Sequence, residues 1–514
     1  RDQRNAGSDL MRVICTQGDF GYFIAGFLLR EFGVRVAPTL NDPLVMRFEP
    51  SLMGGDPERR QAGAALRKLC EALRLHDLGA LCRHLTNPAL DEPLIIEDFR
   101  TDPRERMQAG ALVPERVAFL GHFIDPTFLS RHEPSLSRYT PDQLDVLIRR
   151  TWDSVRPCPL VRRDIRSTFG HAVGFHFIGL LVTSEILFEL LRRHEIERAR
   201  NLIRESVIVA RDHGCRLVGF GQFTSIVTRN CKELVVPGVG FTSGNALTTG
   251  MALQALREVL KRRGKNLKDL HVAVIGAGGN IGSTFARLLA DEARVLTLIG
   301  GTGQDSRSRI EQTAGTILLD QSRQLRLGLT IGPSGERLRS ALPPSRLPQR
   351  AEGDPADILR EGGIIWRSLQ SHFTSSDSLR LGSLDDCRQA DVIVTATNAT
   401  RPILHDDLVG QGAVICDISI PSAVAADVRA RSDVTVFQGG VVALPHGEKL
   451  NIGGLPLEPG LVYACMAETI LLGLERRWDD YSVGDISKEQ VLEITTIAER
   501  NGFRLGRIKE EVSL

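Results

Sequence analysis

The stretch HVAVIGAGGNIGSTFARLL, residues 271–289, decides the fold of this chain. Small and β-branched residues run into a cluster of glycines, and a helical pattern follows. In such a strand–turn–helix, backbone N–H groups at the helix start face a phosphate, one glycine ends the strand and another lets the helix pack tightly. The stretch therefore predicts a dinucleotide-binding turn with contacts from Gly276, Gly278, Gly279, Asn280, Ile281 and Gly282.

Short β-rich segments recur beyond this turn, and helix or loop separates each from the next. They lie at 294–298, 390–395, 412–418 and 434–437. This rhythm predicts an α/β fold with a Rossmann-type, doubly wound parallel sheet. The segment at about 301–385 is unusually long, and we expect its Pro-rich part, 340–355, to form a surface insertion or a partly disordered loop.

The second of these strands, RVLTLIGGTGQDSRSR (294–309), ends in glycines instead of the Asp or Glu that usually binds the ribose of NAD. Arg307 and Arg309 follow and could meet a 2′-phosphate, which favours NADP. The alternative is that both arginines belong to a solvated helix start. Two further cofactor contacts are expected after a later strand, at Thr397 and Asn398.

Composition excludes several classes of protein. The 514 residues are too many for one core, so two to four domains are expected. Hydrophobic residues make up 42% and the net charge is +1, which fits a soluble globular protein without a field for nucleic acid or an acidic membrane. Nine cysteines without a CxxC pair suggest neither a zinc site nor a disulfide framework. Reduced thiols in the cytoplasm, with no metal, are the simple interpretation.

The apolar stretch 172–191 approaches the length of a membrane span. It contains His176, Glu185 and Glu189, each costly in lipid. We therefore expect a buried element that lines an apolar pocket, and no transmembrane segment.

LVYACMAETILLGLERR, residues 461–477, has helical periodicity and places Cys465 in its first turns. The field of the helix would favour the thiolate there, and Glu468 and Thr469 would share the face of Cys465. A cysteine on an apolar helix is more often part of the core. The glycine-rich stretch upstream holds His446 and looks like a loop that lines a site, although a lone histidine is also more often structural.

Taken together, several stretches resemble the long-chain acyl-[acyl-carrier-protein] reductases of cyanobacterial alkane synthesis. They occur in the family's order over residues 117–505 and read VAFLGHFIDP (117–126), GFGQFTSIV (219–227), FTSGNALT (241–248), VAVIGAGGNIGS (272–283), ADVIVTATN (390–398), GGVV (439–442) and ACMAETILLGLERRWDDYSVG (464–484). The family's turn usually reads GATG where this chain has GAGG, and the insertion after the second strand is longer than expected.

The resemblance implies NADPH-dependent reduction of a fatty-acyl thioester to a fatty aldehyde through an acyl intermediate on Cys465. The thioester would be carried by acyl carrier protein or coenzyme A. His446 becomes a candidate proton donor, and the stretch 172–191 would line the acyl tunnel. The oxyanion donors stay open between backbone N–H groups near Cys465 and side chains within 242–245.

The implied division of the chain has five parts. They are an aminotransferase-like fragment (1–90), a linker (91–116), an acyl-thioester-binding domain (117–245), an NADPH-binding domain (246–460) and a helical segment with the nucleophilic cysteine (461–514).

The first 90 residues resemble the C-terminal small domain of class III pyridoxal-phosphate aminotransferases. The resemblance rests on FLLREFGVRVAPTLNDPLVMRFEPSL (27–52), with two short strands around an Asn-Asp-Pro turn, and on a long helical region expected at 57–85. The chain starts with Arg1 instead of Met, so we expect a fragment of an aminotransferase–reductase fusion, inactive as an aminotransferase alone. Pyridoxal phosphate would bind only in the upstream part, and the fragment could support a homodimer or act as a simple packing domain.

Two other functions stay open at this point. One is an NADP-dependent dehydrogenase of a small soluble substrate, with Cys465 buried and inert. The other is a non-catalytic nucleotide-binding module that uses only the glycine turn. Acyl chain length, carrier, oligomeric state and the fate of the aldehyde do not follow from the sequence.

Overall fold

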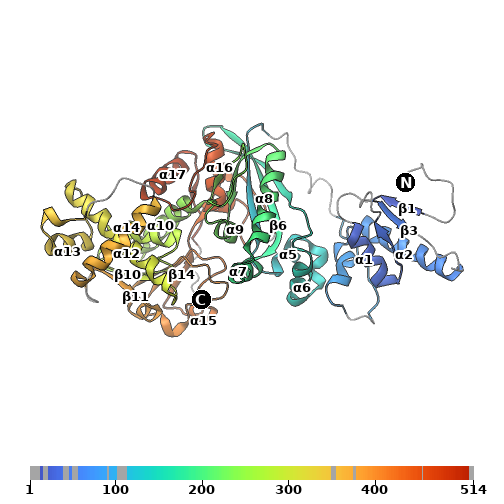
Figure 1. Cartoon of the computed structure of the whole chain (residues 1–514), viewed down its shortest axis with the longest axis horizontal. Coiled ribbons are helices and arrows are strands. Elements are labelled where there is room, and N and C mark those ends of the chain that lie inside the picture. Colours follow the sequence, from blue (N-terminus) through green and yellow to red (C-terminus); the bar gives the residue numbers. More distant parts are fainter. Residues whose placement is uncertain are drawn as a thin grey trace.

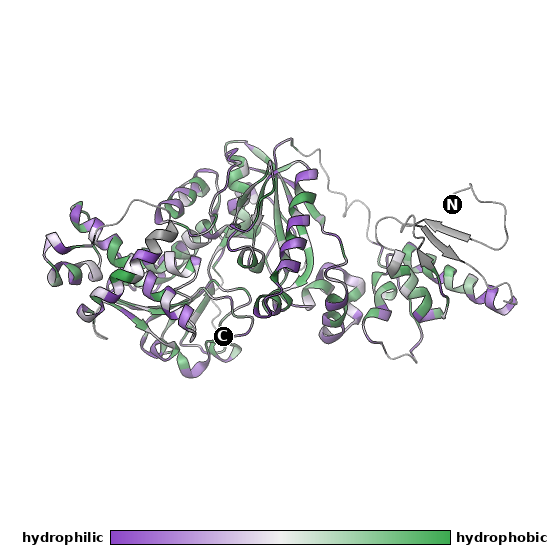
Figure 2. Cartoon of the chain, viewed as in Figure 1, coloured by the Kyte–Doolittle hydropathy of each residue, from purple (hydrophilic) through white to green (hydrophobic). Residues whose placement is uncertain are grey.

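The computed structural model describes residues 12–15, 21–38, 45–48, 56–88, 92–100, 113–348, 355–373, 378–453 and 455–508. Figure 1 shows two sheet-containing units side by side and a smaller N-terminal unit at one end of the chain. In Figure 2 the strands inside both units are hydrophobic, whereas the outer faces of the surrounding helices are largely hydrophilic.

The glycine turn belongs to a six-stranded parallel sheet. Its strands are β9 (His271–Ile275), β10 (Val295–Ile299), β11 (Leu379–Gly382), β12 (Val392–Thr395), β13 (Val414–Asp417) and β14 (Thr435–Gln438). The order β11-β10-β9-β12-β13-β14 winds outward in both directions from β9, and every pair of neighbours is parallel. This confirms the predicted α/β fold with a doubly wound sheet.

The long segment after β10 is mostly helical, and the described residues of its Pro-rich part, where a surface insertion or loop was expected, include a short 3₁₀ turn (Pro344–Arg346) between two helices. It forms α12 (Gln304–Arg326), α13 (Pro333–Ala341) and α14 (Pro355–Leu369) before the chain returns as β11. α12 and α14 meet where both carry glycine, because a Cβ at Gly315 would lie 1.7 Å from the carbonyl oxygen of Gly362. Residues 349–354 of the Pro-rich part lie outside the described residues.

A second sheet has the order β5-β6-β4-β7-β8. These strands are β4 (Arg116–Phe123), β5 (Cys158–Arg166), β6 (Ala172–Thr183), β7 (Cys215–Phe220) and β8 (Gly240–Thr242). Only the pairing of β5 with β6 is antiparallel. Its nearby helices are α5 (Thr127–His132), α6 (Pro141–Thr151), α7 (Ser184–Arg192), α8 (Ile196–Asp212) and α9 (Phe223–Val227).

The apolar stretch 172–191 forms β6 and α7, so it runs through this sheet and then along its surface. None of the helices in the described part of the chain combines the length and the apolar run that crossing a bilayer requires.

The two sheets are joined by α10 (Asn245–Arg262), which leads from β8 towards β9, and by the end of the chain. After β14 the chain forms a small antiparallel sheet, β16-β15-β17, from β15 (Val441–Ala443), β16 (Leu461–Tyr463) and β17 (Arg504–Leu505). The helices that complete these units are α11 (Asn280–Leu289), α15 (Ala426–Arg429), α16 (Ala464–Leu474) and α17 (Lys488–Arg500). α16 packs on β4, β6 and β7 of the second sheet.

The N-terminal unit contains β1 (Arg12–Cys15), α1 (Gly21–Phe32), β2 (Ala37–Pro38), β3 (Val45–Phe48), α2 (Asp56–Arg74) and α3 (Leu78–Cys82). The two strands expected at 36–48 are present and antiparallel, while the Asn-Asp-Pro turn lies outside the described residues.

The long helix expected at 57–85 is interrupted, because His76 adopts a positive φ of 57° and Asp77 then caps α3. Asp77 is fully buried and also forms an ion pair of 2.9 Å with Arg138, which joins this unit to the second sheet's helical layer.

Candidate active site

The glycine turn has the close backbone approaches that a phosphate cradle needs. Gly276 follows β9 with φ of +85°, and a Cβ there would lie 2.1 Å from the carbonyl oxygen of Ala396 at the end of β12. A Cβ at Gly282 would lie 2.2 Å from the carbonyl oxygen of Gly276, so α11 sits against the turn. Gly279 is exposed and precedes the first helical residue, Asn280. The residues present therefore fit a bound pyrophosphate at the start of α11.

The other expected cofactor residues lie around the carboxyl ends of the same strands. Arg307, in the first turns of α12, forms an ion pair of 3.4 Å with Glu311 and is exposed. Glu311 also forms an ion pair of 3.5 Å with Arg367 of α14, so the two arginines share this one carboxylate. Thr397 and Asn398 follow β12 and lie near the surface.

The turn of α12 that follows Arg307 lies directly beside the glycine turn. A Cβ at Gly278 would lie 2.8 Å from Cβ of Arg309, and Thr313 Oγ1 donates a hydrogen bond of 2.9 Å to the carbonyl oxygen of Ala277. These contacts bring Arg307 and Arg309 to the side of the turn where the ribose end of a dinucleotide is expected.

A buried carboxylate organises the loop after β13, which sequence reasoning did not single out. Asp417 accepts hydrogen bonds from Thr395 Oγ1 at 2.5 Å and from Ser422 Oγ at 2.5 Å. Burial raises the pKa of Asp417. The hydroxyl of Ser419 next to it accepts a bond of 3.0 Å from the backbone N–H of Thr397, so this loop is tied to the end of β12.

Cys465 lies at the second residue of α16 and has neighbours from both sheet-containing units. The backbone N–H of Ala464 donates a hydrogen bond of 2.8 Å to the carbonyl oxygen of Gly440, just beyond β14. On the other side, a Cβ at Gly221 would lie 3.7 Å from the thiol sulfur. The thiol is thus placed between the last strand of the dinucleotide-type sheet and the end of β7 in the second sheet.

Gly244, immediately before α10, makes this placement possible. It has φ of +71°, and a Cβ there would lie 2.3 Å from both Cα and Cβ of Cys465. A side chain at this position would be strained in its backbone and would also displace the start of α16.

Burial raises the pKa of the Cys465 thiol to about 12. The backbone N–H of Met466 acts in the opposite direction and lowers this pKa, but by less. The carboxylate of Glu468 adds to the increase. The backbone N–H groups at the start of α16 lower the pKa of this thiol, as expected from the helix field, but desolvation outweighs them in the free protein.

Glu468 shares the helix with Cys465 but faces the start of α10. It is fully buried, accepts a bond of 2.5 Å from Thr242 Oγ1 and another of 2.7 Å from the backbone N–H of Leu247. Burial raises its pKa while these two bonds act against the increase. Glu468 therefore caps α10 next to the thiol.

His446 does not lie beside Cys465. It is exposed, with φ of 54°, three residues beyond β15. In the β15–β16 ladder Val441 faces Tyr463 and Ala443 faces Leu461, so the chain reaches His446 at the end remote from Cys465. The role of His446 as proton donor to this thiol stays a prediction.

The three candidate oxyanion donor side chains within 242–245 differ in the hydrogen bonds that they already make. Thr242 Oγ1 is bound to Glu468, and Ser243 Oγ donates 2.6 Å to the carbonyl oxygen of Ser482. Asn245 is only partly buried, and its Nδ2 makes a long contact of 3.4 Å with Oδ1 of Asn230. Among these side chains, Asn245 retains the most freedom to meet a substrate.

The backbone beside Asn245 has several positive φ values that the sequence did not reveal. Gln222, Arg229, Asn230 and Cys231 have φ of 54°, 50°, 52° and 69°. Such conformations are costly for residues with a side chain and often cluster at functional sites.

A strap, residues 480–486, contacts both sheet-containing units. The carbonyl oxygen of Ser482 accepts the bond from Ser243 described above, beside the thiol. The carbonyl oxygen of Gly484 accepts a hydrogen bond from Nδ2 of Asn280 in the glycine turn. The strap therefore links the expected phosphate cradle with the start of α10.

A small apolar cavity of about 20 Å³, partly open to solvent, lies beyond the thiol in the second sheet. It is lined by Gly121, His122, Phe123, Phe128, His132, Leu160, Phe177, Gly179, Leu180, Ile452, Gly453 and Leu455. Phe177, Gly179 and Leu180 belong to the apolar stretch 172–191, which confirms that this stretch lines an apolar pocket.

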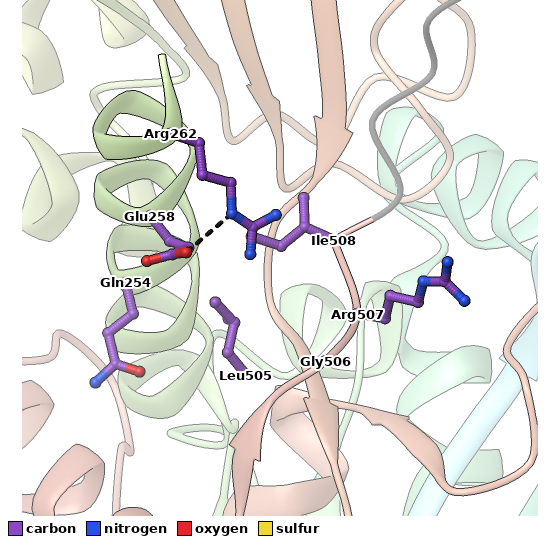
Figure 3. A pocket seen from close by; sticks show the side chains of 7 residues that line it. All are labelled: Gln254, Glu258, Arg262, Leu505, Gly506, Arg507 and Ile508. Carbon is purple, nitrogen blue, oxygen red and sulfur yellow. Dashed lines mark hydrogen bonds and ion pairs between the residues drawn. The ribbon is translucent and has the colours of Figure 1, made fainter. Parts of the chain in front are cut away.

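A separate surface groove runs between the second half of α10 and residues 505–508 (Figure 3). Glu258 and Arg262 lie on one side of it and form an ion pair of 2.9 Å. α10 has 18 residues, and only its first turn is next to Cys465. At about 1.5 Å per residue, Arg262 is some 25 Å along the helix from its start, so this groove is not part of the thiol site.

Two weak relatives are among the curated proteins that match the chain. The chain is 27% identical to "Aminotransferase PigE" of Serratia sp. (strain ATCC 39006) over 298 residues, which cover 57% of this chain and 28% of that protein. It is 26% identical to "Long-chain acyl-[acyl-carrier-protein] reductase" of Synechococcus elongatus over 146 residues, covering 27% of this chain and 42% of the reductase. The chain thus spans less than half the length of either curated relative it matches.

No protein-family model matches the chain. Among solved structures, NAD-dependent malic enzyme from Thermotoga maritima aligns over 76% of this chain and 85% of its own, with 11% identity and a TM-score of 0.29. The two curated relatives support both sequence resemblances loosely and assign the chain to neither family.

Proposed function

We propose that the chain is an NADPH-dependent reductase of fatty-acyl thioesters that forms an acyl intermediate on Cys465. The observation that supports this most directly is the position of the thiol. Cys465 lies within reach of the end of β14, on the side of the dinucleotide-type sheet, and within reach of Gly221, beyond which lies an apolar cavity. A thiol between a cofactor cradle and an apolar cavity suits an acyl chain that is first held and then reduced.

In the proposed first step, Sγ of Cys465 attacks the thioester carbonyl carbon. The bond from Sγ to the acyl carbon forms, the bond to the carrier sulfur breaks, and the thiol proton passes to that sulfur. The pKa of about 12 keeps the resting thiol protonated, so this proton must leave during the step. Asn245, or a backbone N–H at the start of α16, would stabilise the developing oxyanion.

The cofactor residues in this proposal are Gly276, Gly278, Gly279, Asn280, Ile281, Gly282, Arg307, Thr397 and Asn398. When bound, NADPH would supply the hydride that converts the acyl-cysteine to aldehyde and free thiol. The glycines ending β10 offer no carboxylate to the ribose, and Arg307 and Arg309 lie beside that position, which supports NADP over NAD.

The N-terminal unit is proposed to be the end of an aminotransferase joined to this reductase. The alignment with the Serratia aminotransferase is longer than the first 90 residues, so it must extend into the region that resembles the reductases. This supports a fusion in which an acyl thioester is reduced by one part and the aldehyde is aminated by another, with pyridoxal phosphate bound upstream.

The deciding experiment is intact-protein mass spectrometry after mixing the protein with a long-chain acyl thioester, on acyl carrier protein or on coenzyme A, without NADPH. We expect an added acyl mass in the parent, none in Cys465→Ala, and release of aldehyde when NADPH is added. No adduct with either carrier, together with retained NADPH binding, would overturn the acyl-cysteine route.

One observation favours a second candidate, an NADP-dependent dehydrogenase of a small substrate without covalent catalysis. The raised pKa of Cys465 is what an inert core thiol would have. Unchanged turnover of a small substrate by Cys465→Ala would support this candidate.

A further inference from the structure

The face of the second sheet that carries α16 has three glycines in one row across adjacent strands. They are Gly121 in β4, Gly179 in β6 and Gly221 at the end of β7. Gly121 and Gly179 each lie two residues beyond a phenylalanine, Phe119 and Phe177. In register, Gly121 faces Gly179, and Leu120 faces Phe220, so Gly121 and Gly221 are next to one another. A glycine inside a strand weakens it and commonly marks a close approach by a ligand or another chain segment.

The row begins at the thiol and ends at the apolar cavity. A Cβ at Gly221 would lie 3.7 Å from Sγ of Cys465. Gly121 and Gly179, the other two members, line the cavity. The glycine row therefore forms a continuous path over the sheet between the reactive sulfur and the cavity.

Three apolar side chains now occupy this path. A Cβ at Gly221 would lie 2.6 Å from Cζ of Phe119, and one at Gly121 would lie 2.4 Å from Cζ of Phe177. At the third glycine, Gly179, the corresponding contact is 2.3 Å, to Cδ1 of Leu160.

The two phenyl rings lie against each other. They are stacked with centroids 6.3 Å apart and planes 18° apart, and both residues are almost fully buried. Each meets the glycine row with the end of a flexible side chain, which a rotation about χ1 or χ2 can move aside, whereas the glycine backbone cannot yield.

We infer that the glycine row is the floor of the acyl channel, and that Phe119, Phe177 and Leu160 form a gate that closes it when no acyl chain is attached. This inference rests on the proposed acyl-cysteine chemistry. An acetyl group on Cys465 would end near Gly221, before the rings. A long acyl chain would have to displace Phe119 and then Phe177 to reach the cavity, so the gate would determine which chain lengths are accepted.

The gate is tested by the ratio of palmitoylation to acetylation of Cys465, measured by intact mass spectrometry with the two coenzyme A thioesters. In Gly121→Ala a methyl group rises from the channel floor, and the ratio is expected to fall roughly tenfold or more, since one methyl of overlap in an apolar pocket changes discrimination by about 10–200-fold. In Phe177→Ala the ratio is expected to rise, because the ring no longer has to move.

Gly174→Ala is the matched control for Gly121→Ala, since Gly174 is a buried glycine of the neighbouring strand, β6, on the opposite face of the sheet, where it pairs with Arg116 of β4. It should leave the ratio unchanged, and melting curves of all three variants identify any loss of fold. A ratio in Gly121→Ala equal to that of the parent would overturn the gate.

A second measurement separates failure of the gate from failure of the proposed function. If no thioester acylates the parent, the acyl-cysteine proposal is wrong. The gate is then judged by the relative rates at which Cys465 reacts with N-ethylmaleimide and with a long-chain N-alkylmaleimide. A selective loss of the long-chain reaction in Gly121→Ala supports the gate, and equal losses of both contradict it.

Discussion

Glu468→Gln should destabilise the protein and at the same time make Cys465 more reactive. The carboxylate of Glu468 accepts one hydrogen bond at each oxygen, from Thr242 Oγ1 and from the backbone N–H of Leu247. An amide offers a single oxygen. If that oxygen accepts from the N–H of Leu247, the NH₂ group faces Thr242 Oγ1, and the hydroxyl hydrogen of Thr242 loses its acceptor. A lost bond to a charged group, about 1.5–3 kcal/mol, together with an unsatisfied buried donor, about 1–3 kcal/mol, gives a loss of roughly 2.5–6 kcal/mol.

For the sheet-containing unit that holds Glu468, this loss corresponds to a decrease in Tm of roughly 5–24 °C, at about 2–4 °C per kcal/mol. Differential scanning fluorimetry would measure it, with Glu205→Gln as the control, because Glu205 is an exposed glutamate of α8. The control should change stability by less than about 0.5 kcal/mol.

The reactivity of Cys465 provides the second readout. The Glu468 carboxylate contributes to the raised pKa of the thiol, so its removal should lower that pKa. Iodoacetamide should then label Cys465 faster in Glu468→Gln than in the parent at the same pH and below the melting range. A Tm within 1–2 °C of the parent would refute the capping argument, and unchanged labelling would refute the electrostatic one.

Three further predictions concern the thiol, the turn and a buried ion pair. The pKa of Cys465 is raised from 9.0 to about 12, so its thiolate is about 10³-fold scarcer at neutral pH than that of an ordinary cysteine. The alkylation rate of Cys465 should therefore increase about tenfold per pH unit up to roughly pH 11. A plateau of this rate near pH 9 would contradict the prediction. Gly276→Ala should abolish NADPH binding in a fluorescence titration, because its Cβ would collide with the carbonyl oxygen of Ala396; binding at parental affinity would refute the cradle. Arg287→Ala should lower stability to chemical denaturation by about 3–5 kcal/mol, since it leaves Asp320, its partner at 2.8 Å, buried without its ion pair; a change below 1 kcal/mol would show that the pair is not needed.

The elements that the sequence predicted are those whose signal is local. The glycine turn at 276–282 is recognisable in the sequence because a side chain at Gly276 or Gly282 would collide with the backbone, so glycine is required there. Central strands such as β12 and β13 read as apolar runs because both of their faces are buried. β11 was missed since it is an edge strand, pairs only with β10 and carries the polar Arg380.

The helical character of the segment after β10 had a detectable signal that was not used. Ile310, Ala314, Ile317 and Leu318 are buried in α12 at helical spacing. The prolines further along drew the interpretation towards a loop, although they affect only the connection between α13 and α14.

The candidate site was predicted in part, and the missing part depends on contacts between distant segments. The position of Cys465 on a helix followed from periodicity, whereas its desolvation depends on packing that no local pattern records. The glycine row had a visible signature, FLG at 119–121, FIG at 177–179 and GFG at 219–221. Its meaning appears only when the three strands are placed in register.

The strap at 480–486 limits how far this protein can be treated as exchangeable modules. It contacts the glycine turn through Asn280 and the start of α10 through Ser243, and α10 itself runs from one sheet to the other. A chimera that takes residues 246–460 from another protein with a dinucleotide-type sheet would inherit a turn without a partner for Gly484. Engineering of cofactor preference is therefore better attempted by substitutions around α12, which the strap does not touch through these bonds, than by exchange of the whole half.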